Sequence, residues 1–245
     1  VEKKLELLFI GNGSNLLIPD DGFNGLAIRF GPNFGEIQVS NNTITASAGT
    51  SLYKLANTAN ESGSSCFNFL TGIPGTIGGG LVMNAGAFGS EISDYLSKFS
   101  YIDRHGKVRE REKLTDDFSY RESFLQENEK RILLEAEFKL DYHVDQPDMA
   151  EVLDTRREKF PYKYPSAGSV FKNPIELDTS AGELLDRAGA KGLTVGDAAV
   201  SRQHANFILN KGHATAKNIR KTIDILRNRV YKEFGVTLVT EVTVI

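Results

Sequence analysis

The chain has 245 residues, 40% of them apolar and 25% charged, with a formal net charge of −3 at pH 7. This composition is typical of a globular protein, and the negative balance argues against a general nucleic-acid binder, which needs a basic excess. No apolar run approaches the roughly 20 residues that a membrane-spanning helix needs. The single cysteine, Cys66, excludes an internal disulfide and a cysteine-rich metal site. We expect Cys66 to be a small core residue and the protein to be a cytoplasmic monomer.

The N-terminal part of the chain has the pattern of short strands and one helix. A buried strand is expected over residues 5–10, and it leads into the glycine loop Gly11-Asn12-Gly13-Ser14-Asn15. Short strands are expected over 16–18 and 26–28, followed by a hairpin over 36–48 that turns at Asn41-Asn42. Ser51 is a predicted helix N-cap, and Gly63 ends that helix.

A long glycine-rich stretch runs from Gly72 to Gly89 and holds seven glycines. Glycine tolerates positive φ and lets other groups approach the main chain, and Pro74 fixes one φ within the run. We therefore expect a stiff, bare loop whose N–H groups can face an anion. Two glycine loops, each beside apolar strand-like sequence, predict one pyrophosphate-bearing cofactor held at two points. The alternative is that both are tight turns.

The middle of the chain predicts a hairpin over 97–111, which turns at His105-Gly106, and a strand over 131–140. The segment Phe118–Ser123 lies between them without a clear period, so we expect a loop or a short helix there. Loops carry function more often than chance, but taken alone Arg121 reads as a solvated charge.

The second half opens with a charged helix over 149–160. From Arg156 to Lys172 the chain carries five basic residues against one acid, which suggests a small polyanion such as a diphosphate or, alternatively, a solvated basic face. Small residues then lead into Ser169 and a strand-like Val170-Phe171. Helices are expected after the capping box of Ser180 and over 218–234, the latter ended by Gly235.

The last expected strand covers Val236 to Ile245 and carries Glu241. Both of its faces are largely apolar or β-branched, so we expect the strand to be buried on both faces. A carboxyl there is costly when ionised unless it is paired, because burial favours its neutral form. Glu241 is therefore either part of an ion pair that closes the fold or a tuned acid at a functional site.

The sequence lacks the motifs of a metal site, a serine hydrolase and the common nucleotide-binding loops. The four histidines show no metal-ligand spacing, so no metal is expected, and no Gly-x-Ser-x-Gly elbow surrounds a serine. Neither glycine loop is followed by a Walker lysine or has Rossmann spacing.

Taken together, the motifs resemble the UDP-N-acetylenolpyruvoylglucosamine reductase family, also called UDP-N-acetylmuramate dehydrogenases, the flavoenzymes of peptidoglycan precursor synthesis. The matching stretches span nearly the whole chain in the family's order: Gly11–Leu17, Gly72–Gly89, Tyr120-Arg121, Ser166–Pro174, Ala188–Gly192, His204–Phe207 and Glu241. The absence of a longer insertion between the glycine run and Ser169 resembles the family's shorter type.

The resemblance implies an α+β fold of the vanillyl-alcohol-oxidase-like (PCMH-type) FAD-binding class. Residues 1–30 would form the first FAD-binding subdomain, and residues 31–148 with 236–245 would form the second. Residues 149–235 would form an α+β substrate-binding domain. The family normally has a strand and a helix before the first glycine loop, so we expect the first subdomain to be N-terminally truncated here.

The resemblance also implies the cofactors FAD and NADPH and the substrate UDP-N-acetylglucosamine enolpyruvate, a nucleotide sugar. Arg121 and Glu241 would stabilise the enol(ate) formed when hydride reaches the enolpyruvyl group, and Ser169 would protonate the neighbouring carbon. The substrate-side positions would be Tyr120, Arg156, Lys159 and Asn173. The positions assigned to FAD are Gly11, Asn12, Gly13, Ser14, Asn15, Leu16, Gly72, Ile73, Pro74, Gly75, Thr76, Gly78, Gly79, Asn84, Gly86 and Ala87.

Two other functions stay open on the sequence. One is an FAD-dependent sugar or alcohol oxidase of the same superfamily. Such oxidases often attach FAD through a histidine or cysteine near the glycine loops, whereas Cys66 precedes the long run and no histidine lies before His105. The other is a non-catalytic nucleotide-sugar binding protein, which would be colourless.

Overall fold

The structure is a computed structural model that describes residues 5–126 and 131–245. The first four residues of the predicted N-terminal subdomain lie outside the described residues. The chain forms two compact units, one of residues up to Gly13 with Gly25–Thr155, the other of Ser14–Asn24 with Arg156–Ile245. The predicted division into three parts draws different boundaries and stays a prediction.

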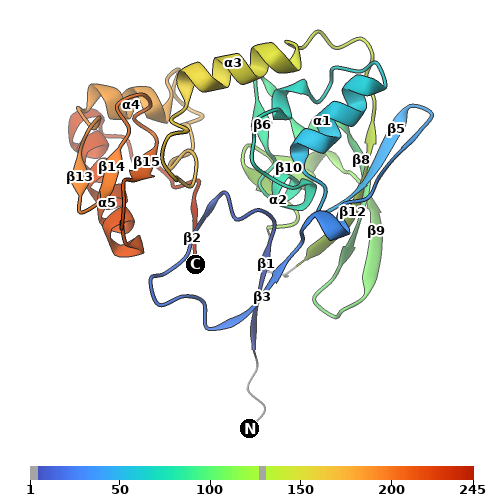
Figure 1. Ribbon diagram of the computed structural model, residues 1–245, viewed down its shortest axis with the longest axis horizontal. Helices are drawn as coiled ribbons and strands as arrows, with labels where there is room; N and C mark the ends of the chain where they lie inside the picture. The colour runs from blue at the N-terminus through green and yellow to red at the C-terminus, as the bar shows by residue number, and fades with distance from the viewer. Residues whose placement is uncertain (1–4, 127–130) are drawn as a thin grey trace. The chain divides into compact units, whose positions relative to one another are not determined.

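The first unit is built on an antiparallel five-stranded sheet (Figure 1). Its strands, in spatial order, are β4 (Ile37–Ser40), β5 (Thr43–Ser47), β12 (Ile132–Lys139), β8 (Leu96–Ile102) and β9 (Val108–Glu112). Both expected hairpins, β4–β5 and β8–β9, are confirmed. Asn41 adopts the left-handed φ of 51° at the first turn, and Gly106 has a φ of 75° at the second.

Two helices, α1 (Leu52–Glu61) and α2 (Ile77–Val82), pack with this sheet around one hydrophobic core (Figure 1). The hydroxyl of Ser51 accepts the N–H of Lys54 at 3.1 Å, which confirms the predicted N-cap of α1. The buried face of α1 is formed by the predicted residues Leu52, Leu55, Ala56 and Ala59. Cys66 is fully buried in the same core, as expected.

The expectation of a bare loop from Gly72 to Gly89 is wrong for its centre, because Gly78, Gly79 and Gly80 lie inside α2. These glycines have no positive φ. A Cβ on Gly78 would lie 3.1 Å from the carbonyl oxygen of Ala48, and one on Gly80 would lie 2.9 Å from a methyl of Leu52. Glycine is thus needed here for close packing rather than for an unusual backbone conformation.

The first unit also contains several short elements. Strand β1 (Glu6–Ile10) pairs in parallel with β3 (Gly25–Arg29), and β6 (Gly86–Ala87) pairs with β7 (Ser90–Glu91). Segment 118–123 forms the hairpin of β10 (Phe118–Ser119) and β11 (Glu122–Ser123), so the expectation of a loop or short helix is corrected. The alternation of apolar and polar residues that predicts a strand cannot be recognised here, because each strand has only two residues. Short 3₁₀ helices cover Pro32–Phe34, Asn68–Leu70, Ile92–Tyr95 and Thr115–Asp117.

The second unit has an antiparallel sheet of β13 (Thr194–Val195), β14 (Ala198–Val200) and β15 (Ile208–Asn210). Helices α4 (Ala181–Arg187) and α5 (Ala216–Phe234) share its core. The Ser180 cap of α4 is confirmed, as is the end of α5 at Gly235, whose φ is 70°. The boundary between the units falls within α3 (Met149–Lys159), the expected charged helix.

The expectation of one long strand from Val236 to Ile245, buried on both faces, is wrong. Only β16 (Thr243–Val244) is a strand, and it pairs in parallel with β2 (Leu16–Leu17). Leu238 and Val242 are buried, but Val239 is 59% exposed. β-Branched residues favour extended backbone whether or not they are buried, so their presence did not establish burial.

None of the helices in the described parts of the chain has the length and apolar content that crossing a bilayer would need.

Candidate functional site

The two glycine loops meet in the first unit. A Cβ on Gly11 would lie 2.5 Å from the hydroxyl oxygen of Thr76, so no larger residue fits between the loops as they stand. The side-chain amide of Asn12 also donates to the carbonyl of Pro74 at 3.4 Å. Residues about sixty positions apart in sequence thus lie side by side.

The loops differ in the N–H groups that they offer. Asn12 and Gly13 are exposed, and no acceptor among the described residues takes their backbone N–H groups. In the second loop the N–H groups of Gly78 and Gly79 donate to Ala48 O and Thr76 Oγ1. The expectation that this loop presents its N–H groups to an anion is therefore wrong at these two positions, because protein acceptors already take both N–H groups.

Arg121 lies in the turn of the β10–β11 hairpin with a φ of 59°. Its guanidinium donates to the carbonyl of Asn84 at 3.3 Å and to that of Gly86 at 3.0 Å, and its Cζ lies 4.9 Å from the ring centre of Tyr120. Two predicted site residues, Tyr120 and Arg121, are thus joined to the end of the glycine run. The sequence signal for a solvated charge was misleading, because Arg121 is half-buried and ordered by these bonds.

Asn84, which was predicted to contact FAD, is enclosed by protein groups. It is fully buried, and its side chain is bound to protein groups from Glu91, Ser93 and Ser119. A contact of Asn84 with a cofactor stays a prediction. Gly86 and Ala87 are half-buried in β6.

In the second unit the structure brings the segments that carry Ser169 and Glu241 side by side. The N–H of Glu241 donates to the carbonyl of Val170 at 2.8 Å, next to the isolated bridge of Phe171 with Thr240. Both Ser169 and Glu241 are half-buried. Gly168, with a φ of 79°, turns the chain into Ser169, which explains the small residues before it.

Asn206 is a site residue that the sequence argument did not assign. It is buried, it accepts the N–H of Phe171 at 2.9 Å, and it donates to the carbonyl of Phe171 at 2.8 Å. Its own carbonyl accepts the N–H of Val170 at 2.9 Å. These bonds hold the backbone of the two residues that follow Ser169. An asparagine between Ala205 and Phe207 in an apolar run was the available signal.

Asn15 holds the segment that carries Glu241 by hydrogen bonds on both sides of Val242. Its side-chain amide donates to the carbonyl of Glu241 at 3.0 Å, and its carbonyl accepts the N–H of Thr243 at 3.0 Å. Leu16 pairs with Thr243 in the β2–β16 ladder. The end of the first glycine loop therefore positions the segment that carries Glu241.

Arg156, predicted on the substrate side, lies 4.9 Å from the ring centre of Phe160. Its buried Nε has no hydrogen-bond partner among the described residues. Phe160 contacts the rings of His204 at 5.4 Å and Phe207 at 5.3 Å, and Phe207 forms the isolated bridge with Ser169. The aromatic rings of Phe160 and Phe207 thus connect Arg156, whose buried Nε lacks a partner among the described residues, to the Ser169 segment.

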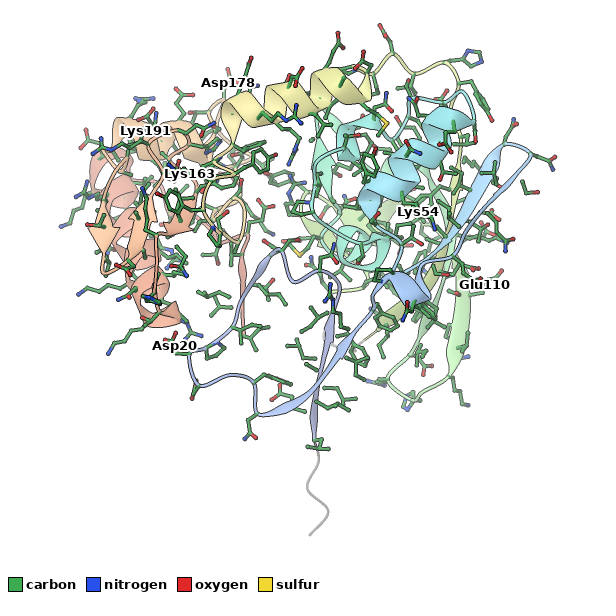
Figure 2. The ribbon with its side chains drawn as sticks, in the orientation of Figure 1. Asp20, Lys54, Glu110, Lys163, Asp178 and Lys191 are labelled. Carbon is green, nitrogen blue, oxygen red and sulfur yellow. The ribbon has the colours of Figure 1, made fainter. Side chains whose placement is uncertain are left out.

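The surroundings of His204 are positively charged. Burial lowers the pKa of its imidazole, and the cations of Lys191 and Lys159 lower the pKa further. Lys191, labelled in Figure 2, is also paired with Asp186 at 2.6 Å. The sequence could not show this environment of His204, since it depends on residues from three separate segments. Asn173 is exposed and accepts the N–H of Ala181 at the start of α4.

Among the described residues there is no group of three His, Cys, Asp or Glu side chains that could hold a metal ion.

Comparison with known proteins assigns the chain to a family. The UDP-N-acetylenolpyruvoylglucosamine reductase of Anoxybacillus flavithermus is 41% identical over 239 residues, which are 96% of this chain and 78% of that protein. The reductase of the same name from Clostridium novyi is 38% identical over all of this chain and 79% of its own length. The chain belongs to the UDP-N-acetylenolpyruvoylglucosamine reductase family.

The domain matches agree with this reductase family. The UDP-N-acetylenolpyruvoylglucosamine reductase C-terminal domain matches residues 160–245, and an FAD binding domain matches residues 1–111. The crystal structure of the Thermus caldophilus reductase superposes with a TM-score of 0.80 at 35% identity, covering 99% of this chain and 86% of that one. The resemblance and the predicted fold class, an FAD-binding fold with a C-terminal α+β domain, are confirmed.

Proposed function

We propose that this protein reduces UDP-N-acetylglucosamine enolpyruvate to UDP-N-acetylmuramate, with NADPH as reductant and FAD as bound cofactor, in the synthesis of the peptidoglycan precursor. The observation that carries the proposal is the match over nearly the whole chain to reductases of this name. The reaction makes the protein an enzyme of cell-wall formation, on which cell shape and division depend.

The residues present fit FAD. The pyrophosphate is an anion, and the exposed N–H groups of Asn12 and Gly13 have no protein acceptor among the described residues. A side chain at Gly11 would fill the surface where the loops meet. When bound, FAD supplies the hydride chemistry between NADPH and the enolpyruvyl group. The other predicted FAD contacts stay part of this proposal: Ser14, Asn15, Leu16, Gly72, Ile73, Pro74, Gly75, Thr76, Gly78, Gly79, Asn84, Gly86 and Ala87.

Arg121 is proposed to stabilise the negative charge that develops on the enolpyruvyl carboxylate as hydride arrives. A guanidinium stays ionised and can bind two carboxylate oxygens at once. Such a fixed cation is effective when it is held in place before the reaction, because no reorganisation is then needed. The bonds to the carbonyls of Asn84 and Gly86 support this role.

Ser169 is proposed as the proton donor. Its hydroxyl proton passes to the carbon next to the one that receives hydride, so that the double bond becomes saturated. A serine is a weak acid, but a carbanion-like centre is a strong base, and the proton is recovered afterwards through a neighbour or solvent. Glu241, whose N–H donates to the carbonyl of Val170 beside Ser169, is proposed to stabilise the same enol(ate) by a hydrogen bond to the enolate oxygen.

Arg156, Lys159, Tyr120 and Asn173 are proposed to contact the nucleotide-sugar diphosphate. The buried Nε of Arg156, a donor without a partner among the described residues, supports an acceptor from substrate at this place. A basic group can hold a phosphate through charge-assisted hydrogen bonds.

We also propose a monomer that works in the cytoplasm, where NADPH and nucleotide sugars are made. Sedimentation equilibrium would then give a single species of 27.0 kDa plus bound FAD. A species of twice that mass would overturn the monomer.

The test of the proposed function is an anaerobic visible spectrum of the purified protein, first alone, then with NADPH, then with UDP-N-acetylglucosamine enolpyruvate. We expect a flavin spectrum that bleaches with NADPH and returns with substrate. Recovery only with oxygen would favour the oxidase. A colourless protein whose nucleotide-sugar binding is unaffected by Arg121→Ala and Glu241→Ala would favour the non-catalytic binding protein.

A further inference from the structure

The guanidinium of Arg121 is aimed by the segment that follows α2. Its side chain donates hydrogen bonds to the backbone carbonyls of Asn84 and Gly86, at 3.3 and 3.0 Å. A carbonyl points where its backbone points, so the direction of the guanidinium depends on how residues 84–86 are held.

Asn84 is fixed by its own side chain. Its amide nitrogen donates to a carboxylate oxygen of Glu91 at 2.5 Å and to the carbonyl of Ser119 at 2.9 Å, and its amide oxygen accepts the N–H of Ser93 at 3.4 Å. It is fully buried and has a φ of 42°, a conformation that asparagine accepts more readily than most residues. One amide therefore joins α2, the β10 strand of the Arg121 hairpin and the segment after β7.

Glu91 contacts the 84–86 segment at both of its ends. It lies opposite Gly86 in the β6–β7 pair, and a Cβ on Gly86 would be only 2.9 Å from the Cγ of Glu91. Burial raises the pKa of the Glu91 carboxyl, while the hydrogen bond from Asn84 and the cations Arg121 and Lys113 act in the opposite direction. Asp94 is the other carboxylate that faces it.

We propose that Asn84 and Glu91 are positioning residues that aim the Arg121 guanidinium at the substrate carboxylate, an inference that rests on the proposed function. Glu91 accepts the hydrogen bond that fixes the Asn84 amide. The Asn84 amide holds the hairpin of Arg121 through Ser119, and the Asn84 carbonyl accepts a bond from the guanidinium. Both the backbone and the side chain of Arg121 are thus tied to the same residue.

A matched pair of variants tests the role of the acceptor. Glu91→Gln keeps an oxygen that can accept from Asn84, while Glu91→Met keeps the length of the side chain and removes the acceptor. We expect Glu91→Met to slow flavin reoxidation by substrate about 10- to 100-fold, since a misplacement of about 1 Å can cost about 100-fold. Its KM for substrate should rise, and flavin reduction by NADPH should change less than about twofold. Glu91→Gln should recover most of the reoxidation rate.

The Arg121→Ala background separates positioning from a general structural effect. There Glu91→Met should add no further loss, because the residue it positions is absent. Melting temperatures of the flavin-free variants, a readout independent of activity, should show that both variants fold. Three results would overturn the inference: equal slowing of both half-reactions, an unchanged reoxidation rate in Glu91→Met, or a Glu91→Gln variant as slow as Arg121→Ala. The last result is decisive even if Glu91→Met does not fold.

Reoxidation of the unmutated (parent) protein by substrate distinguishes a failure of this inference from a failure of the proposed function. If substrate does not reoxidise the reduced parent protein, the proposed function fails. If the parent is reoxidised and Arg121→Ala is slow, but Glu91→Met matches the parent, only the positioning inference fails.

Discussion

The side-chain amide of Asn15 donates a hydrogen bond of 3.0 Å to the backbone carbonyl of Glu241, which lies 226 residues later in the chain. The carbonyl of Asn15 accepts the N–H of Thr243 at 3.0 Å, so Asn15 binds both sides of Val242. The first glycine loop therefore ends in a residue that orders the C-terminal segment. We therefore expect a substitution of Asn15 to alter the position of the Glu241 backbone.

Asn15→Ala should lower the free energy of unfolding by about 1 kcal/mol, the usual net value of one partly buried hydrogen bond. Reoxidation of the flavin by substrate should slow more than its reduction by NADPH, because the Glu241 segment loses an anchor. Urea unfolding and stopped-flow absorbance would measure the two effects. Asn12→Ala is the matched control, since its amide makes only an exposed bond of 3.4 Å, and it should leave the unfolding midpoint nearly unchanged. Equal destabilisation by the two variants would contradict the role of Asn15.

Gly11→Ala should destabilise the protein by about 1–3 kcal/mol, the range for overpacking, because the new methyl would lie 2.5 Å from Thr76 Oγ1. The loops would have to separate, so the affinity for FAD should fall as well. Equilibrium unfolding and FAD titration of the flavin-free protein would measure both. Gly31→Ala is the control, because a Cβ there meets no atom within 4 Å and its φ of −112° suits alanine. If both variants behave like the parent, the loops are not packed as described.

Ser169→Ala should leave FAD binding and flavin reduction by NADPH intact and slow substrate reduction by about 10²- to 10⁴-fold, the usual contribution of a positioned acid. The hydroxyl is the only group removed, and the neighbouring backbone is held independently by Asn206. Single-turnover kinetics under anaerobic conditions would measure each step. Ser166→Ala, at an exposed serine of the same motif, should behave like the parent. An equal loss in both half-reactions would refute proton donation by Ser169.

Stability should fall as the pH drops from 7 through the ordinary pKa of histidine, 6.5, and the cause should be His204. Burial and the cations of Lys191 and Lys159 lower its pKa in the folded state, so below pH 6.5 the unfolded chain binds a proton that the folded one resists. This favours unfolding until the lowered pKa is passed. Urea midpoints between pH 7.5 and 5 would show the slope, and His204→Gln should reduce it. His213→Gln, at an exposed position, should keep the parent slope. A His204→Gln profile identical to the parent would exclude this cause.

Local signals in the sequence predicted most of the regular elements. Ser51 and Ser180 each predicted the start of a helix, because a capping hydroxyl accepts the N–H of the residue three positions later. Gly235 predicted the end of α5, because glycine readily adopts the left-handed backbone that ends a helix. The hairpin at Asn41 was predicted because apolar and polar residues alternate on both sides of an asparagine, which tolerates positive φ. The ordered set of motifs led to the family, which the comparisons confirmed.

The sequence alone therefore determined most of the strands and helices, the kind of cofactor and the family, since each depends on neighbouring residues or on a motif. Only the tertiary structure decided that Gly78 and Gly80 serve packing inside a helix, that Arg121 depends on Asn84, and that Asn15 holds the Glu241 segment. The physical reason is that these roles depend on close approaches and hydrogen bonds between groups distant in the chain. A residue's type permits such a bond, but only the folded backbone brings its partner within reach.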